Sequence, residues 1–118
     1  MTAFEGSSFV EIKGIPYETI DLETLAPAEH PGSRGTAIWR TASRGDIRVR
    51  IVEYGPGYLA DHSCNKGHVV YVLEGSFVSE LKDGRKSVVS KGMCYLVSDG
   101  AEAHRSSSEG GVRLLIVD

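Results

Sequence analysis

Three histidines and one cysteine in the second half of the chain have the residue types and spacing to do chemistry. His62 and Cys64 stand two positions apart, so an extended backbone would point both side chains to the same face. His68 begins the next apolar run, and His104 follows the turn at residues 98–100. In an antiparallel barrel these segments can be neighbours, which would gather three imidazoles and a thiol around one point. Such a donor set suits zinc, iron, nickel or copper rather than magnesium or calcium, which prefer oxygen ligands.

Each of these side chains also has a simpler interpretation. A histidine taken alone at the end of a strand is more often a hydrogen-bonded structural residue than a ligand. Cys64 can be a fourth ligand, or it can merely line the space beside three histidine ligands. The spacing therefore predicts a metal site built from His62, Cys64, His68 and His104, with the role of the thiol open.

The elements that must position these residues are short strands. The chain has 118 residues, which indicates one domain, and its 14 glycines are about 12 % of the residues against a usual ~7 %. So many chain-breaking residues favour strands joined by tight turns over long helices. Gly75 is expected to break one apolar run, and Asp83-Gly84 is a hairpin signal. The expected strands cover residues 47–52, 67–73, 77–81, 86–89, 93–97 and 112–117. Strands at this spacing predict an all-β, single-domain antiparallel β-barrel or jelly roll.

The first part of the chain is less regular. Residues 1–34 hold too few apolar residues to form a core, and we predict an irregular N-terminal arm that packs on a barrel formed by residues 35–118. Within this arm, Asp21 is a candidate N-cap for one helical turn that ends before Pro27.

Charge and composition exclude several classes of partner. The chain has 13 basic and 16 acidic residues, a formal charge of −3, so we expect no nucleic-acid partner. The longest apolar run, residues 69–73, is far too short to span a bilayer, and we expect no membrane partner. The N-terminus does not resemble a signal peptide, and two cysteines are too few for a disulfide framework. We therefore expect a soluble cytoplasmic protein with reduced thiols.

Two stretches of the chain resemble the conserved motifs of the cupin superfamily. The first cupin motif has a glycine, a His-x-His pair, a glutamate and a second glycine, and residues 57–75 reproduce this spacing. The second motif has two glycines and a histidine, and residues 92–104 resemble it. The similarity is greatest to small single-domain cupins with a DHCW motif, because residues 61–64 and 66–68 resemble the hallmark run of that subgroup. The resemblance covers roughly residues 46–117 and implies a cupin-type fold.

The ligand set implied by the resemblance departs from the usual cupin set. Cys64 replaces the second histidine and His68 replaces the glutamate, so the implied ligands are His62, His68 and His104, with Cys64 as a fourth candidate. One divalent transition metal ion per chain is expected, with zinc, iron, nickel and copper all open. The tryptophan of the DHCW motif is absent, since Ser63 lies between His62 and Cys64. The resemblance also implies a homodimer.

The altered ligand set has a consequence for function. Three neutral imidazoles leave the metal with a charge of about +2, which favours an anionic small molecule in the open coordination positions. We therefore expect a metal-dependent enzyme acting on a small organic molecule, of the oxygenase or the isomerase/lyase type. The alternative is a non-catalytic cupin module that binds or senses a metal or small ligand. The sequence contains no clear acid or base at a motif position that would decide between them.

Overall fold

The computed structural model of the protein describes residues 9–118, so the first eight residues of the predicted arm lie outside the described residues. The described residues form one 3₁₀ turn and nine strands. These elements are, in chain order, η1 (Leu22–Thr24), β1 (Ala28–Pro31), β2 (Thr36–Arg44), β3 (Ile47–Tyr54), β4 (Tyr58–Leu59), β5 (His68–Leu81), β6 (Lys86–Ser90), β7 (Cys94–Val97), β8 (His104–Ser108) and β9 (Val112–Val117).

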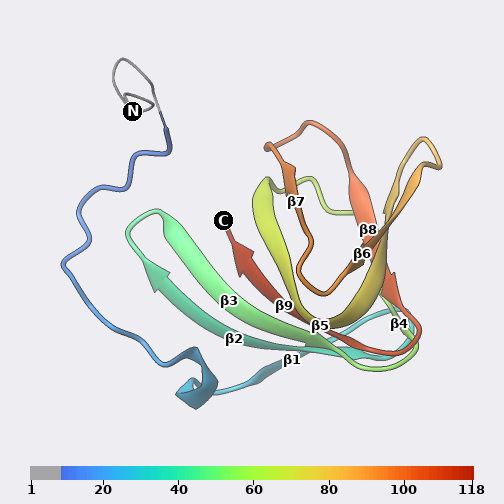
Figure 1. Ribbon diagram of the computed structural model, residues 1–118, viewed down its shortest axis with the longest axis horizontal. Helices are drawn as coiled ribbons and strands as arrows, with labels where there is room; N and C mark the ends of the chain where they lie inside the picture. The colour runs from blue at the N-terminus through green and yellow to red at the C-terminus, as the bar shows by residue number, and fades with distance from the viewer. Residues whose placement is uncertain (1–8) are drawn as a thin grey trace.

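The strands curl into an antiparallel barrel in which β5 is the central element (Figure 1). The strand order is β1-β2-β3-β9-β5-β8-β4, and β6 and β7 also pair with β5. The first half of β5 pairs with β7 and β9, whereas its second half pairs with β6 and β8. Every pairing is antiparallel, which confirms the predicted all-β barrel.

The prediction that Gly75 breaks the strand is wrong, because Gly75 lies inside β5, a strand of 14 residues that continues to Leu81. The pairing with β9 shifts register between Val72 and Glu74, which is a β-bulge. Gly75 has a φ of +81°, a conformation that side chains disfavour, and a Cβ atom there would overlap the Gly111 carbonyl oxygen. The glycine therefore bends β5, so that one strand serves both halves of the barrel.

The core follows from the alternation of side chains along the strands. In β9, Val112, Leu114 and Ile116 are buried, and the residues between them are less buried. Val70 and Val72 of β5 face the same interior. Two charged or titratable side chains, Arg50 and His104, are also buried, with relative exposures of 4 % for each residue. Buried groups of this kind need partners, and these partners define the functional site.

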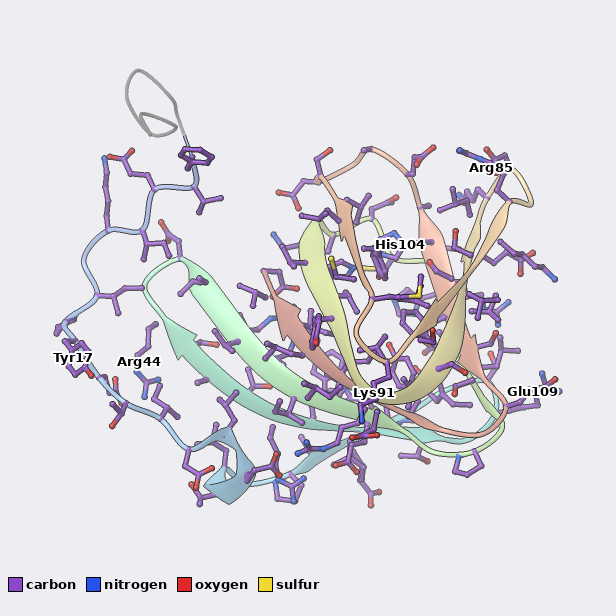
Figure 2. The ribbon with its side chains drawn as sticks, viewed as in Figure 1. Tyr17, Arg44, Arg85, Lys91, His104 and Glu109 are labelled. Atoms are coloured by element: carbon purple, nitrogen blue, oxygen red, sulfur yellow. The ribbon has the colours of Figure 1, made fainter. Side chains whose placement is uncertain are left out.

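The segment before β2 passes along the outside of the barrel. The predicted helical turn is present as η1, and the Asp21 side chain accepts a hydrogen bond from the Glu23 backbone at its start. β1 pairs with β2. Further upstream, Glu18 forms a two-point ion pair with Arg44 at the end of β2, and Tyr17 is 95 % exposed (Figure 2). Across residues 9–118, no helix has the length and apolar character needed to cross a membrane.

Candidate functional site

Strand register brings the polar residues of the site into neighbouring rows on the inner face. The backbones of Arg48 and Asp118 exchange hydrogen bonds, and His68 begins β5 directly beside the end of β9. Two residues further along β3, Arg50 pairs with Ile116 of β9. A residue from β3, one from the end of β9 and one from β5 therefore meet although they are far apart in the sequence.

The centre of the site is a pair of imidazole rings. His68 Nε2 and His104 Nε2 are 2.9 Å apart, and the ring planes are inclined by 62°. His104 Nδ1 lies 2.9 Å from the Glu102 carbonyl oxygen, which can only accept, so this nitrogen carries the hydrogen. The Nε2 of His104 therefore has a free lone pair. The bond between the two rings then requires its hydrogen on Nε2 of His68.

His68 sits between this pair and a carboxylate. Its other nitrogen, Nδ1, lies 3.6 Å from Asp118 Oδ2, a distance too long for a hydrogen bond, and it has no hydrogen-bond partner among the described residues. Burial and the neighbouring His104 lower the pKa of His68, while Asp118 acts in the opposite direction. His68 is therefore neutral at rest, and a carboxylate lies close enough to stabilise it when it gains a proton.

Asp118 is itself held by two arginines. Arg48 makes two hydrogen bonds to its carboxylate, at 2.8 and 3.0 Å, and Arg50 Nη2 makes one at 2.9 Å. The Asp118 side chain is only 1 % exposed. Burial alone would raise the pKa of Asp118, but the hydrogen bond from Arg48 and the charges of both arginines outweigh it and lower the pKa to about 2. The carboxylate therefore stays ionised at neutral pH.

Arg50, His68 and His104 line a cavity of about 400 Å³ inside the barrel. Its walls are largely aromatic and include Trp39, Tyr54, Phe77 and Tyr95. The Tyr95 hydroxyl oxygen lies 3.0 Å from His68 Nε2, a nitrogen that carries a hydrogen, so the phenol does not donate to it. Burial raises the pKa of Tyr95, so its own O–H stays protonated and can donate to a ligand. Figure 2 shows His104 among the side chains enclosed by the strands. The cavity thus combines an apolar wall with a few convergent polar groups, which is typical of small-molecule sites.

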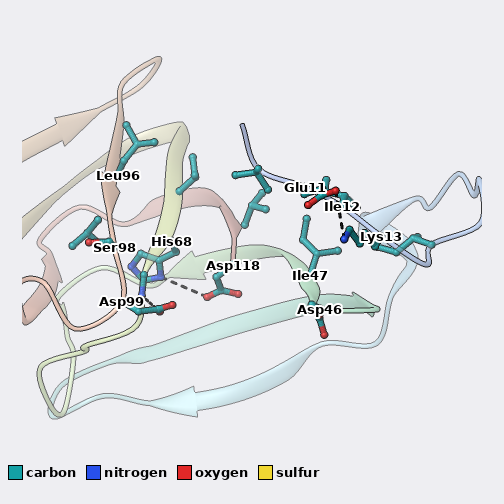
Figure 3. Close-up of a pocket in the computed structure, with 16 residues that line it drawn as sticks. Glu11, Ile12, Lys13, Asp46, Ile47, His68, Leu96, Ser98, Asp99 and Asp118 are labelled. Carbon is teal, nitrogen blue, oxygen red and sulfur yellow. Dashed lines mark hydrogen bonds and ion pairs between the residues drawn. The ribbon is translucent and has the colours of Figure 1, made fainter. Parts of the chain in front are cut away.

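His68 also borders a second, outer space. A groove of about 820 Å³ runs between residues 10–15 and the rim of the barrel, and His68, Leu96 and Asp118 lie on its barrel side. Figure 3 shows this groove, with the His68–Asp118 contact on one side and Ile12 and Ile47 on the other. The His68 ring therefore lies between the groove and the interior cavity.

The other two predicted ligands lie apart from the imidazole pair. Residues 60–67 do not form a regular strand, although Cys64 and His104 make an isolated bridge of two backbone hydrogen bonds. His62 is turned to solvent with 77 % of its side chain exposed, and its Nδ1 lies 2.6 Å from Asp61 Oδ1. The Cys64 sulfur accepts a hydrogen bond from the Lys66 backbone at 3.3 Å. Both side chains line the mouth of the cavity.

The donors present match part of a metal shell. Two ligands that bind one metal at right angles at ~2.0–2.1 Å lie about 2.9 Å apart, which is the separation of the two Nε2 atoms. His104 also presents an unprotonated nitrogen, as a ligand must. However, no group of three or more His, Cys, Asp or Glu side chains within residues 9–118 is arranged to hold a metal ion. The predicted four-donor site therefore stays a prediction. Of the imidazole pair, His104 Nε2 is free to bind a metal, whereas His68 would first have to move its hydrogen from Nε2 to Nδ1, the nitrogen that faces Asp118.

Several residues of the site were not predicted as site residues from the sequence. His30 is one of them: its ring stacks on Trp39, with the two ring centroids 3.7 Å apart, and it lines the cavity. Tyr95 and Asp118 were also missed. The sequence contains one signal for a polar group of residues at the site, because the alternation in residues 47–52 places Arg48 and Arg50 on one face of a strand. In this barrel that face points inward, since Arg50 is buried and lines the cavity.

Comparisons with known proteins identify the fold. Neither a scan against protein families nor a search of curated proteins finds a match. Solved structures do match. An RmlC-like cupin from Shewanella frigidimarina is 18 % identical, with a TM-score of 0.66, over 87 % of this chain and 90 % of that chain. A sugar phosphate isomerase of the cupin superfamily from Silicibacter pomeroyi is 18 % identical, with a TM-score of 0.66, over 85 % of this chain and 74 % of that chain.

A third solved structure, Fe(II)-HppE with an alternative substrate, is 10 % identical, with a TM-score of 0.70, over 86 % of this chain and 60 % of that chain. The molecule is thus an antiparallel β-barrel with a largely aromatic cavity that contains a few polar groups. Its fold is that of a small single-domain cupin, as the two sequence motifs implied. At these levels of identity the similarity defines the fold, and the function has to be argued from the site.

Proposed function

We propose that this cupin barrel is an enzyme of the isomerase or lyase type, which moves a proton on a small organic molecule bound in the interior cavity. The observation that carries the proposal is the imidazole pair, in which His68 and His104 face each other at 2.9 Å inside a cavity that has room for a ligand. Two coupled imidazoles can accept a proton from one atom of a ligand and return it to another. A sugar phosphate isomerase among the structural neighbours is consistent with this class of reaction.

The residues around the pair have distinct roles in such a step. The substrate loses a proton from a carbon next to a carbonyl group, and the C–H electron pair moves to the carbonyl oxygen to form an enolate. The imidazole pair takes the proton, and when the resulting positive charge lies on His68, its Nδ1 is 3.6 Å from the Asp118 carboxylate, which stabilises it. Return of the proton to a neighbouring atom completes an isomerisation, and departure of a leaving group completes an elimination.

Tyr95 is placed to stabilise the negative charge that develops on the substrate. Its hydroxyl lies 3.0 Å from His68 Nε2, and burial raises the pKa of the phenol, so it remains protonated. A protonated phenol in a water-poor cavity can donate a hydrogen bond to an enolate oxygen as charge develops there. The phenol would thus stabilise the negative charge on the enolate oxygen, and Asp118 would stabilise the positive charge on the imidazole pair.

We extend the proposal to a second use of the same pair, in which His68 and His104 would hold one divalent transition metal ion and would then serve as its ligands instead of as the base. Such an ion would polarise a substrate carbonyl or carboxylate oxygen. The structural neighbour solved with Fe(II) shows that this fold accommodates a metal. In this chain the two Nε2 atoms have the separation of adjacent ligands, and Cys64, backbone-paired with His104, lines the mouth of the same cavity.

Metal titration of single variants tests this extension. We expect His68→Ala and His104→Ala to weaken binding of Zn²⁺ by at least about tenfold, because each removes one of two converging donors. We expect His62→Ala to leave the affinity unchanged, since its imidazole points to solvent and is bonded to Asp61. Isothermal titration calorimetry with Zn²⁺ measures the three affinities, and Cys64→Ser shows whether the thiol takes part. Equal losses in His62→Ala and His104→Ala would instead support the four-donor site predicted from the sequence.

Exchange with solvent deuterium tests the proposed reaction class before the substrate is known. In D₂O, an enzyme that removes a proton next to a carbonyl replaces it with deuterium, and one-dimensional NMR detects the loss of the proton signal. A panel of small keto and hydroxy acids, each incubated with the protein as purified, is expected to include compounds that exchange faster than in buffer. Tight binding across the panel with no exchange and no turnover would contradict the proposal and support the alternative, a non-catalytic ligand-binding module.

A further inference from the structure

Arg50 is a charged side chain buried inside the cavity with part of its hydrogen-bonding capacity unused. The residue is 4 % exposed and lines the cavity wall. Nη2 donates to Asp118 at 2.9 Å, but Nε has no acceptor among the described residues. A buried donor of a charged group is costly to leave unpaired, so its presence in a cavity points to an acceptor that arrives with a ligand.

Charge around Arg50 supports the same conclusion. Arg48 and Arg50 both bind the single carboxylate of Asp118, so the three side chains carry a net charge of +1. The two imidazoles that line the same cavity, His68 and His104, add no negative charge, because a histidine side chain is either neutral or cationic. The Arg48–Arg50–Asp118 cluster therefore keeps one positive charge in excess, and an anionic group on the ligand would neutralise it.

Aromatic packing fixes the orientation of the guanidinium. Its central carbon lies 4.3 Å from the centroid of the Trp39 ring, a cation–π contact, and His30 is stacked on that ring at 3.7 Å. Because Trp39 covers one face of the planar group and Asp118 binds Nη2, the edge that carries the unpaired Nε is a binding edge left for a ligand. A carboxylate fits the edge of a guanidinium through parallel hydrogen bonds.

We propose that Arg50 is the binding residue for the carboxylate of the substrate, and that the substrates of this barrel are small, planar carboxylic acids. The inference rests on the proposed function and adds the class of substrate to it. The carboxylate binds at the free edge of Arg50, and the planar body of the molecule lies among the aromatic walls formed by Tyr54, Phe77 and Tyr95. The reacting carbon then extends toward the imidazole pair, which borders the same cavity.

The chain contains its own reporter for this site, because Trp39 is its only tryptophan and stacks on Arg50. We would titrate the full chain with benzoate and follow the intrinsic fluorescence of Trp39. Benzamide has nearly the same shape without the charge and serves as the control ligand. We expect a saturable change with benzoate, and an affinity for benzamide lower by about tenfold or more. Equal affinities for the two compounds would overturn the proposal.

Variants assign the binding to Arg50. Arg50→Gln is expected to weaken benzoate binding by about tenfold or more, because it removes a charge-assisted hydrogen bond. Arg113→Gln is the matched control, since Arg113 is a partly buried arginine of β9 that is paired with Glu53 and does not line the cavity. Arg50→Lys keeps the charge but loses the planar edge, and it replaces Arg50→Gln if thermal melting shows that the glutamine variant does not fold. Unchanged benzoate affinity in either folded Arg50 variant would overturn the proposal.

A third variant separates this proposal from the proposed function. His104→Gln removes the imidazole pair without touching Arg50, so benzoate binding should stay within about threefold of the wild-type value. Loss of deuterium exchange with retained benzoate binding is the result expected if both proposals hold. Benzoate binding that depends on Arg50, in a protein that exchanges no proton of any compound in the panel, would refute the reaction class and leave the carboxylate site standing.

Discussion

Replacement of His104 by glutamine is expected to slow deuterium exchange of a responsive compound by about 10²–10⁴-fold, the usual contribution of general acid–base catalysis. Glutamine can still donate a hydrogen bond to the Glu102 carbonyl, as His104 Nδ1 does, but it cannot take up a proton at neutral pH. The barrel should remain folded, because the change preserves a polar side chain of similar length. The initial rate of loss of the proton NMR signal measures the effect, and circular dichroism checks the fold.

His62→Gln is the matched control for this experiment. It makes the same replacement at an exposed imidazole, 77 % accessible, at the mouth of the same cavity. We expect a change in exchange rate of less than about threefold. If His62→Gln were as inactive as His104→Gln, the active groups would not be the pair seen in the structure, and the sequence-based ligand set would be the better description.

Replacement of Asp118 by alanine is expected to destabilise the barrel strongly. It leaves the buried guanidinium of Arg50 without its ionic partner, and breaking a buried pair in this way costs about 3–5 kcal/mol. A loss of this size should lower the melting temperature by about 10 °C or more. Glu74→Ala is the control, since it removes an exposed ion pair with Lys91 that contributes no more than about 1 kcal/mol. Similar melting temperatures for Asp118→Ala and Glu74→Ala would show that Asp118 does not hold Arg50 in solution.

The same carboxylate makes the stability of the wild-type protein depend on pH. The pKa of Asp118 falls from 3.8 to about 2 on folding, so its contribution is fully present above pH ~4 and is lost as the pH falls toward 2. The loss amounts to about 2 kcal/mol. Urea denaturation at pH 5 and at pH 2.5 measures it, and Asp118→Asn should lack this component of the acid sensitivity. An asparagine variant that loses as much stability in acid as the wild type would assign the effect to other carboxylates.

Much of the fold follows from local sequence signals. The alternation in residues 77–81 and 86–89 around Asp83-Gly84 predicted the β5–β6 hairpin, and Asp21 correctly marked the single helical turn. Gly75 was misinterpreted because a glycine in a β-rich stretch can mark either a turn or a bend. Only its packing against Gly111, 36 positions later, distinguishes the two. That contact is a property of the closed barrel and has no local signature.

The candidate site was predictable to a smaller extent. The cupin resemblance selected His68 and His104, which the structure brings together, and it also selected His62, which faces solvent. The difference arises because residues 60–67 form an irregular loop, in which side-chain direction does not follow a period of two. Asp118 was not recognised because its role depends on pairing with Arg48 across 70 positions.

The position of β9 within the sheet has a consequence for how the molecule folds. β9 lies between β3 and β5, so the ladder that places Asp118 beside Arg48 joins residues that are 58 to 68 positions apart. The entropy cost of closing the long loop comes before the favourable contacts of such a ladder can form. Domains dominated by non-local strand pairs therefore fold in milliseconds to seconds. From this separation we expect the Arg48–Arg50–Asp118 cluster to form late in folding. Both arginines would then stay hydrated until Asp118 reaches them, so that no unpaired charge is buried in a partly formed core.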